Sequence, residues 1–304
     1  MPSVRQLLLF ATATCVAAAS SFSYTMKDDY QPQNFDHFFS MFDFNSQPDK
    51  SNGYVKYLDQ TTAEQKALIG RVGGSAVYVG VDNETAWTYP DPLITGRSSV
   101  RIESKNAYTH GLFIADIAHM PGDACGAWPG FWLYGPEWPS NGEIDILENV
   151  NNAIQNKMSL HAGGQCCGTF DYRTTSFGRG FNENGGGVYA LEWTSEAFAI
   201  WFWPNGTAPH NVFSDTPDPS QWYQPTGNFS AGSGCKVDEE FKNNRIVFNT
   251  DFCGDWAKSV WESSGCQSST GTTCEAFVAA NPSIFSLSYW TIRSLRVFQA
   301  QGDT

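Results

Sequence analysis

The sequence predicts an all-β sandwich, and three observations support this fold class. Short runs rich in Val, Ile, Phe, Tyr and Trp recur along the whole chain, separated by clusters of Gly, Pro, Asn and Ser. Candidate helices are few and short, and neither an internal repeat nor a low-complexity tract divides the sequence. Strand-forming runs at this spacing, with turn residues between them, are typical of two stacked antiparallel sheets.

The expected elements follow from these runs. The predicted strands cover residues 75–81, 98–103, 111–117, 188–193, 197–203, 245–250 and 290–298. The predicted helices cover residues 61–68 and 259–264. Trp193, Trp201 and Trp203 alternate with other residues within two of the strands, so we expect them to pack inside the protein.

The N-terminal segment predicts a signal peptide over residues 1–19. Arg5 supplies a positive charge, residues 7–19 are apolar but too few to cross a bilayer, and three alanines at 17–19 form a small-residue cleavage site. We therefore expect residues 20–304 to form a single domain that is secreted and not anchored to a membrane.

Charge and aromatic content limit the class of partner. The chain carries 18 Lys and Arg against 31 Asp and Glu, a net charge of -13. Because such an acidic protein repels nucleic acid and anionic membranes, neither is an expected partner. Aromatic residues make up 15% of the chain, and their faces can stack on sugar rings. A neutral polysaccharide is therefore the expected partner, and we expect the protein to act as a monomer.

Cysteine usage also indicates export. Of the 8 cysteines, all except Cys15 follow the predicted signal peptide, which fits three disulfides and one free thiol. Cys266 and Cys274 bracket a Ser/Thr/Gly loop and are candidates for a local pair, while the other pairings stay open. Three Asn-x-Ser/Thr sequons predict glycosylated surface loops. These sequons begin at Asn83, Asn205 and Asn228.

The strongest functional signal lies at residues 141–149, which read Asn-Gly-Glu-Ile-Asp-Ile-Leu-Glu-Asn. Isoleucine favours an extended strand, so side chains alternate between two faces and Glu143 shares a face with Asp145. A β-bulge would bring Glu148 onto that face as well. Clustered carboxylates repel each other, which costs stability unless a function uses them. Paired carboxylates that flank a bond carry out glycoside hydrolysis, whereas the plain alternative is a solvated edge strand.

Strand geometry also predicts the type of hydrolysis. With a bulge that absorbs one position, the Cα atoms of Glu143 and Glu148 lie about 13 Å apart. Side chains that lean together narrow this gap toward the ~5–5.5 Å of retaining glycosidases, rather than the ~6.5–9.5 Å of inverting ones. Asp145, between them, would hydrogen-bond the nucleophile and raise its neighbour's pKa by charge repulsion.

Further motifs accompany the acid strand in a fixed order. They lie at residues 35–60, 99–105, 125–132, 138–139, 251–256 and 289–299. Together with the acid strand they resemble glycoside hydrolase family 16 in its bulged, laminarinase-type form, most closely the fungal endo-1,3(4)-β-glucanases. The resemblance implies a concanavalin A-like β-jelly-roll whose concave sheet forms the cleft. It implies no cofactor. A structural calcium ion occurs in such folds, but no run of ligands here specifies one.

The resemblance also implies roles for individual residues. Glu143 is the implied nucleophile, Asp145 its assistant and Glu148 the general acid/base. The implied substrate-binding residues are Trp138, His161, Arg101, Trp132 and Trp256. His161 is expected beside the acid/base.

Some positions have alternative interpretations. The alternative for Arg101 is an ion pair with Glu103 or Asp116. We expect Trp128 to belong to the core instead of the cleft. The chain departs from many family members at Lys56, where they carry Asn.

The implied activity is that of a secreted, retaining endo-β-glucanase that cuts internal β-1,3 bonds, with β-1,4 bonds next to them as further targets. Two alternatives stay open. One is transglycosylation, in which a sugar instead of water resolves the intermediate. The other is a lectin-like β-glucan-binding protein without hydrolysis, against which the presence of both glutamates argues.

Overall fold

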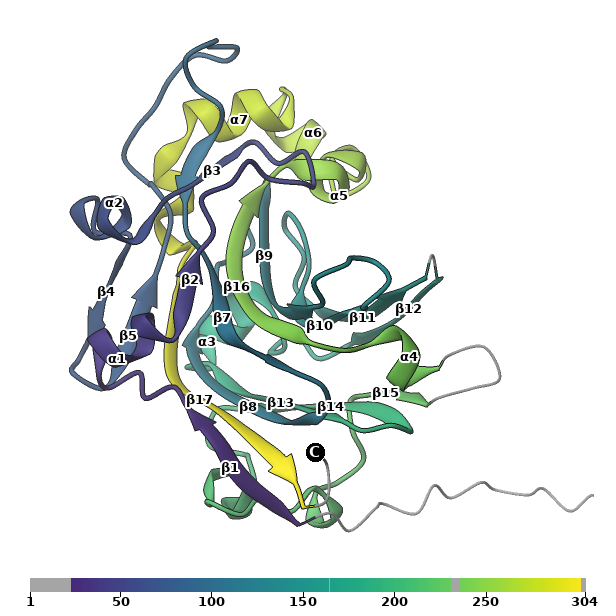
Figure 1. Cartoon of the computed structure of the whole chain (residues 1–304). Helices are drawn as coiled ribbons and strands as arrows, with labels where there is room; N and C mark the ends of the chain where they lie inside the picture. The colour runs from purple at the N-terminus through teal and green to yellow at the C-terminus, as the bar shows by residue number, and fades with distance from the viewer. Residues whose placement is uncertain (1–22, 164, 231–235, 302–304) are drawn as a thin grey trace, which may run out of the picture.

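The structure is a computed structural model that describes residues 23–163, 165–230 and 236–301. Two large antiparallel sheets face each other, which confirms the predicted all-β sandwich (Figure 1). The predicted signal peptide lies outside the described residues. Among the residues that are described, no helix is long and apolar enough to cross a membrane.

The first sheet has eight strands. In spatial order they are β15 (Gly227–Ser230), β14 (Ala197–Pro204), β13 (Gly187–Trp193), β8 (Gly111–His119), β17 (Trp290–Ala300), β5 (Ala76–Val79) and β4 (Ile69–Val72), with β1 (Tyr24–Asp29) paired to β17. The central pairs join segments far apart in sequence, such as β8 with β17.

The second sheet has seven strands and is the one that carries the acid strand. In spatial order they are β12 (Gln165–Asp171), β11 (Asn156–Ala162), β10 (Glu143–Glu148), β9 (Ala127–Tyr134), β16 (Asn244–Phe252), β7 (Arg101–Tyr108) and β2 (Phe42–Phe44). A separate parallel pair joins β3 (Val55–Tyr57) to β6 (Arg97–Ser99). All of the predicted strands are present, and the predicted run 98–103 is divided between β6 and β7.

The helices are short and connect the strands. They are α1 (Phe35–Ser40), α2 (Gln60–Gln65), α3 (Gly178–Glu183), α4 (Val237–Glu240), α5 (Gly254–Ser259), α6 (Cys266–Thr270) and α7 (Cys274–Ala280), with 3-10 turns η1 (His210–Phe213), η2 (Pro219–Gln221) and η3 (Pro282–Leu287). The predicted helix 61–68 corresponds to α2. The prediction of a helix over 259–264 is wrong, because α5 ends where that run begins. No side chain caps the start of α5, so the sequence lacks the capping signal that marks where this helix begins.

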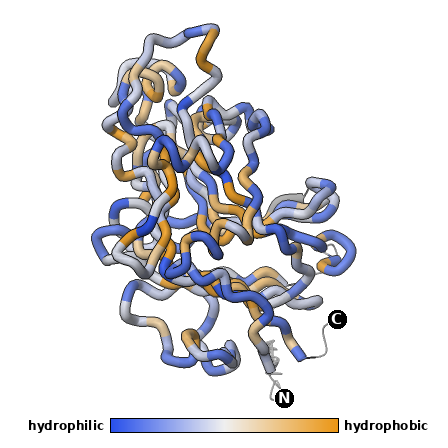
Figure 2. Tube along the Cα trace, turned by 60° about the vertical axis from the view of Figure 1, so that its left-hand side comes forward, coloured by the Kyte–Doolittle hydropathy of each residue, from blue (hydrophilic) through white to orange (hydrophobic). Residues whose placement is uncertain are grey.

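The hydrophobic core lies mainly between the two sheets, as the apolar segments through the middle of the trace in Figure 2 show. Trp193 is fully buried there. Trp201 and Trp203 pack instead on the outer side of the eight-stranded sheet, against the edge of Trp222. The prediction that all three strand tryptophans are packing residues is confirmed.

Two disulfides attach helices to the ends of the two central strands of the second sheet. Cys125, just before β9, pairs with Cys266 of α6, and Cys253, just after β16, pairs with Cys274 of α7. The expected local pair between Cys266 and Cys274 is therefore wrong, because each of these helices is bonded to the sheet instead of to the other helix. Cys167 is free and exposed. Cys235 lies outside the described residues, so a third disulfide stays a prediction.

Candidate active site

The acid strand β10 contains the predicted bulge. Glu143 lies opposite Tyr134 of β9 and His161 of β11, and the register then shifts between Asp145 and Glu148 on both sides. The side chains of Ile144, Ile146 and Leu147 are fully buried in the core. The extra residue therefore turns Glu148 outward, onto the face that already carries the other two carboxyl groups.

The bulge is held by a side chain that the sequence analysis did not identify. Asn156, the first residue of β11, is fully buried. Its side-chain amide donates to the backbone oxygen of Ile146 at 2.8 Å and accepts from the backbone N–H of Glu148 at 2.8 Å. A bulge leaves backbone groups without their sheet partners, and the Asn156 amide replaces those partners.

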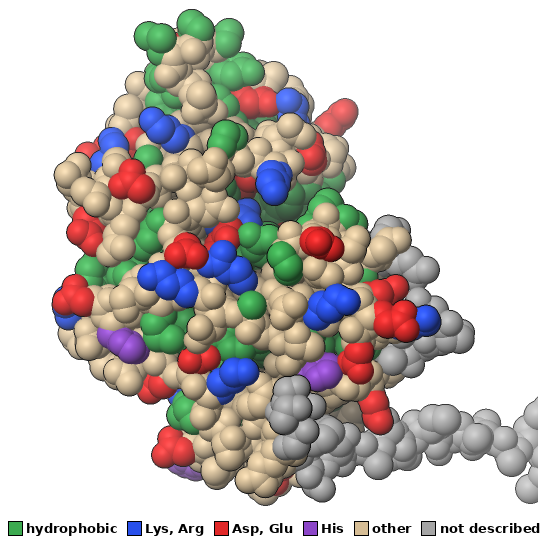
Figure 3. Space-filling view, viewed as in Figure 1, with side chains coloured by type: hydrophobic (Ala, Val, Ile, Leu, Met, Phe, Trp, Pro, Cys, Tyr) green, Lys and Arg blue, Asp and Glu red, His purple; other side chains and the backbone are tan. Residues whose placement is uncertain are grey.

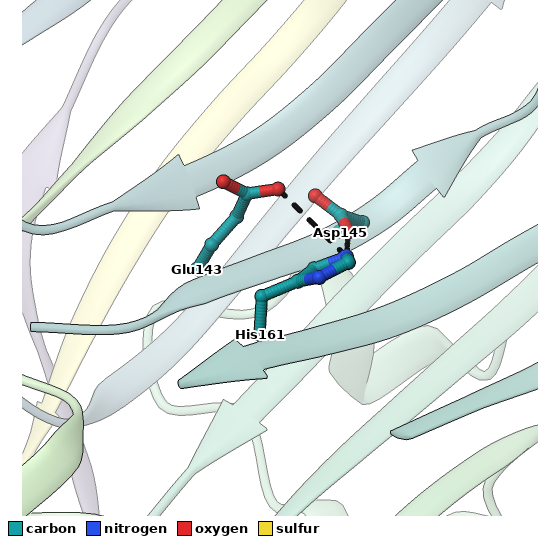
Figure 4. Close-up of side chains that lie close together, drawn as sticks. All are labelled: Glu143, Asp145 and His161. Atoms are coloured by element: carbon teal, nitrogen blue, oxygen red, sulfur yellow. Dashed lines mark ion pairs between the residues drawn. The ribbon is translucent and has the colours of Figure 1, made fainter. Parts of the chain in front are cut away.

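Glu143, Asp145 and His161 form one cluster (Figure 4). The His161 ring reaches over from β11 and places Nε2 3.2 Å from Asp145 Oδ2 and 3.9 Å from Glu143 Oε1. His161 was expected beside Glu148. The register instead sets it opposite Glu143, because the bulge displaces Glu148 along the strand.

Burial raises the pKa of all three carboxyl groups on this face. Asp145 is 1% exposed, and burial together with the charge of Glu143 holds its pKa well above the usual range. The pKa of Glu143 is raised by burial, while the positive charge of His161 and hydrogen bonds from Trp138 and Asp145 lower it. Burial and the repulsion between Glu143 and Asp145 therefore favour one proton shared by this pair over two charged carboxylates.

Glu148 has a different environment from the other two acids. Burial, followed by the charge of Asp145, holds its pKa well above the usual range. Trp128 Nε1 donates to Glu148 Oε1 at 2.8 Å and favours the charged form. The expectation that Trp128 belongs to the core is wrong. The sequence did carry a signal for this position. Trp128 lies four residues before Trp132 on the same strand, and residues separated by an even number of positions in a strand share a face.

Trp256 supports this arrangement from α5. Its ring meets the Trp128 ring edge-on, with centroids 5.7 Å apart. Lys157, which lies opposite Glu148 on β11, places Nζ 4.5 Å from the centroid of the Trp256 ring. Trp256 therefore contacts a lysine and a second tryptophan. Its side chain is half-buried, so part of the ring is still exposed to solvent.

Arg101 on β7 and Trp132 on β9 lie together across β16, the strand between them. The Arg101 guanidinium stands 5.0 Å from the centroid of the Trp132 ring, and its Nε donates to Glu103 at 2.8 Å. Trp132 Nε1 donates to Asn249 at 2.9 Å, which fixes the ring plane. Of the two alternatives for Arg101, the ion pair with Glu103 is present, and Asp116 pairs with Arg293 instead.

Trp138 is the most exposed of the expected site aromatics, at 58%. It lies in the loop that leads into β10, next to Glu143. In Figure 3 the surface is hollowed beside β9 and β16, where acidic, basic and hydrophobic side chains meet. Lys56 is exposed on β3.

The cluster in Figure 4 also has the composition of a cation site. Glu143, Asp145 and His161 offer one ligand atom each, all within 4.8 Å of one another. The short distances between these atoms are equally consistent with two carboxyl groups that share a proton and have a histidine beside them. The donor set does not by itself select a metal.

Comparison with known families shows which family the chain belongs to. The family described as "XgeA-like, catalytic GH16 domain" matches residues 42–170 and 162–298. The chain belongs to glycoside hydrolase family 16. Its acid strand, β10, lies inside the first matched segment, so the clustered carboxyl groups are part of the family 16 catalytic domain.

The curated relatives of this chain include fungal glucanases. An "Endo-1,3(4)-beta-glucanase" of Arthroderma benhamiae is 40% identical over 93% of this chain and 66% of its own length. A "Probable endo-1,3(4)-beta-glucanase" of Aspergillus niger is 38% identical over 95% of this chain but 42% of its own length. The chain thus spans between 42% and 66% of the length of these two relatives.

Solved family 16 structures share the fold closely. An elongating β-1,3-glucosyltransferase is 38% identical, with a TM-score of 0.82 over 91% of this chain and 100% of that one. Laminarinase 16A from Phanerochaete chrysosporium, solved with 6-O-glucosyl-laminaritriose in donor and acceptor sites, is 33% identical, with a TM-score of 0.82 over the same shares. Both likenesses support the β-jelly-roll expected from the sequence.

Proposed function

We propose that this protein is a retaining endo-β-glucanase that hydrolyses internal β-1,3-glucosidic bonds, and β-1,4 bonds adjacent to them. The observation that carries the proposal is the bulged strand β10, which turns Glu143 and Glu148 toward one face with Asp145 between them. The names of the fungal relatives support the substrate class.

In the first step, a carboxylate oxygen of Glu143 attacks the anomeric carbon. The glycosidic C–O bond breaks, and Glu148 gives its proton to the leaving oxygen. A covalent glycosyl-enzyme ester results, with Glu148 as a carboxylate. In the second step, Glu148 takes a proton from water, and the hydroxide oxygen attacks the anomeric carbon and displaces Glu143. Two inversions restore the configuration of the substrate.

The electrostatics of the face suit these roles. The nucleophile must be charged, and the acid must be protonated, in the same free enzyme. Hydrogen bonds from Trp138 and Asp145, with the charge of His161, favour the Glu143 carboxylate. Burial and neighbouring acid charge favour the protonated form of Glu148. The pKa of both groups is raised, but more of the surrounding interactions favour the charged form at Glu143 than at Glu148.

The remaining site residues would bind the glucan. Trp138 offers an exposed aromatic face for a sugar ring, and the Arg101 guanidinium, held by Glu103, offers donors to sugar hydroxyls. Trp132, His161 and Trp256 complete the proposed set. The ligand is an uncharged β-glucan, and we propose that a monomer binds it without nucleic acid, membrane or cofactor.

Export is part of the proposal. We propose that residues 1–19 are a signal peptide and that residues 20–304 form one secreted domain. The two disulfides support an oxidising compartment, where such bonds persist. Mass spectrometry of the secreted protein, with its new N-terminus near Ser20, would test this.

Release of reducing ends from a linear β-1,3-glucan tests the activity. Parallel assays use a mixed 1,3/1,4-glucan, a pure 1,4-glucan and a galactan. Rapid release of mixed-length oligomers from the β-1,3-glucan is the expected result. Chains longer than the substrate would indicate transfer to a sugar, the activity named for the 38% identical glucosyltransferase. Binding without release would favour the lectin-like alternative, and activity on galactan alone would overturn the substrate.

A further inference from the structure

The bond between Trp128 and Glu148 distinguishes the two oxygens of this carboxyl group. Trp128 Nε1 donates to Oε1 at 2.8 Å. An indole N–H can only donate, so Oε1 must act as the acceptor in this pair. A proton on Oε1 that pointed toward Trp128 would collide with the indole hydrogen. The carbonyl oxygen of a protonated carboxyl group is a better acceptor than its hydroxyl oxygen, so the bond from Trp128 to Oε1 favours the proton on Oε2.

The Trp128 ring has little freedom to turn away from Glu148. The ring of Trp256 abuts it edge-on. On another side, the backbone of Gly254 approaches so closely that a Cβ atom there would come within 2.9 Å of the Trp128 ring. Gly254 also has a φ of 60°, which a residue with a side chain rarely adopts. The indole N–H is thus held in the direction of Glu148.

Glu148 is also held at its backbone. Asn156 accepts its N–H at 2.8 Å, on the far side of the bulge from Trp128. The bond from the Glu148 N–H to Asn156 fixes the backbone from which the side chain starts. The bond from Trp128 fixes one of the two carboxyl oxygens. Among the described residues, Trp128 is the side chain that hydrogen-bonds the carboxyl group of Glu148.

We propose that Trp128 is a positioning residue that determines which oxygen of Glu148 carries the proton given to the leaving group. This inference rests on the proposed function of Glu148. The same oxygen, Oε2, delivers the proton in the first step and receives the proton of water in the second. The carboxylate that exists between the two steps keeps its charge-assisted bond from Trp128, which stabilises it where the charge develops.

The test uses the dependence on the leaving group. Trp128→Phe removes the N–H donor, and aryl β-1,3-oligoglucosides supply poor (phenyl) and activated (2,4-dinitrophenyl) leaving groups. Activated phenols depart without a proton, so only the poor leaving group needs a correctly placed acid. We expect Trp128→Phe to lower kcat/KM for the phenyl substrate by about 100-fold, at the low end of what general acid catalysis contributes. The dinitrophenyl substrate should change by less than about threefold in the glycosylation step.

The pH profile gives a second readout that a purely structural role would not move. Because the Trp128 bond favours the charged carboxylate, its loss raises the pKa of Glu148. The alkaline limb of kcat/KM should therefore shift to higher pH in Trp128→Phe. The control is Trp222→Phe, which removes an indole bond to Asn211 on the outer side of the other sheet and should change neither readout.

Benzothienylalanine at position 128 separates the lost N–H from the lost ring. This residue keeps the shape of the indole and replaces N–H by sulfur, so it should reproduce the loss seen with the phenyl substrate even where the Phe variant folds poorly. Equal losses with both leaving groups, or an unshifted alkaline limb, would overturn the inference. Absence of activity in the unmodified protein on both substrates would instead contradict the proposed function.

Discussion

Asn156 and Glu148 are joined by a hydrogen bond of 2.8 Å that crosses the bulge of the acid strand, from the backbone N–H of Glu148 to the side-chain oxygen of Asn156. The same amide donates to Ile146. One buried side chain thus supports the backbone on both sides of the extra residue that turns Glu148 outward. The position of a proposed catalytic acid depends on an amide eight residues away.

Asn156→Leu should therefore lower both stability and activity. The substitution keeps the volume but leaves a buried N–H and a buried C=O without partners, at a cost of about 1–3 kcal/mol for each group. We expect the free energy of unfolding in urea to fall by about 2–5 kcal/mol. Asn152→Leu is the control. It removes an exposed bond to Ser264 and should stay within about 0.5 kcal/mol of the unmodified protein. A cost for Asn156→Leu as small as that of the control would contradict the support role.

Glu143→Ala should abolish turnover of β-1,3-glucan while the fold remains intact. Removal of a nucleophile lowers kcat by at least about 10⁴-fold in enzymes of this kind of mechanism. Added azide can occupy the space of the lost carboxylate, attack the anomeric carbon and restore part of the activity with inverted products. Glu137→Ala, an exposed glutamate six residues earlier, is the matched control. More than a trace of activity in Glu143→Ala without azide would show that the nucleophile is another group.

Asp251 should make folding stability depend on pH. Burial, followed by the charge of Asp49, raises its pKa to about 8. Ser51 Oγ lies 2.6 Å from Asp49 and 2.8 Å from Asp251, yet a hydroxyl carries one hydrogen. A proton on Asp251 supplies the second bond. Because the folded pKa exceeds the unfolded value of 3.8, the stability from this proton is complete below pH 3.8 and is lost as the pH rises through about 8.

Asp251→Asn should flatten this dependence, because an amide donates to Ser51 at every pH. Urea unfolding at pH 4, 6 and 8 measures the effect, and the variant should gain stability relative to the unmodified protein as the pH rises. Asp215→Asn changes an exposed carboxyl and serves as the control. A constant difference between Asp251→Asn and the unmodified protein over this range would mean that Asp251 is charged throughout.

The two disulfides should differ in their contribution to stability. Cys125–Cys266 closes a separation of 141 residues, and Cys253–Cys274 closes one of 21. On the chain-entropy account, the longer loop restricts the unfolded chain more, by about 1–2 kcal/mol at 25 °C. Paired Ser variants, unfolded in guanidinium, should show the larger loss for Cys125–Cys266. The reverse order would indicate that native contacts around α7 outweigh chain entropy.

Local pattern determined much of the candidate site. Glu143 and Asp145 share a face because side chains alternate along any strand, and the spacing to Glu148 required a bulge if all three were to act together. The strands that surround them were predictable from runs of β-branched and aromatic residues between turn residues. The family resemblance rests on such contiguous motifs, and the match over residues 42–298 confirms it.

Other features depended on the register between strands. His161 is opposite Glu143 instead of Glu148, and Trp128 reaches Glu148 instead of the core, because the bulge and the pairing of β9 with β10 and β16 decide which side chains meet. The predicted pair Cys266–Cys274 failed for a similar reason. Closeness in sequence favoured it, while the packing of α6 and α7 against the strand ends brought other cysteines together.

By itself, the sequence determined the fold class, the acid strand and its bulge, since each is encoded by the periodicity of a few consecutive residues. Only the tertiary structure decided the partners of those acids: Asn156 at the Glu148 backbone, Trp128 at its carboxyl group and His161 beside Asp145. These contacts join different strands, and their geometry depends on the register of the whole sheet, which no short stretch of sequence encodes.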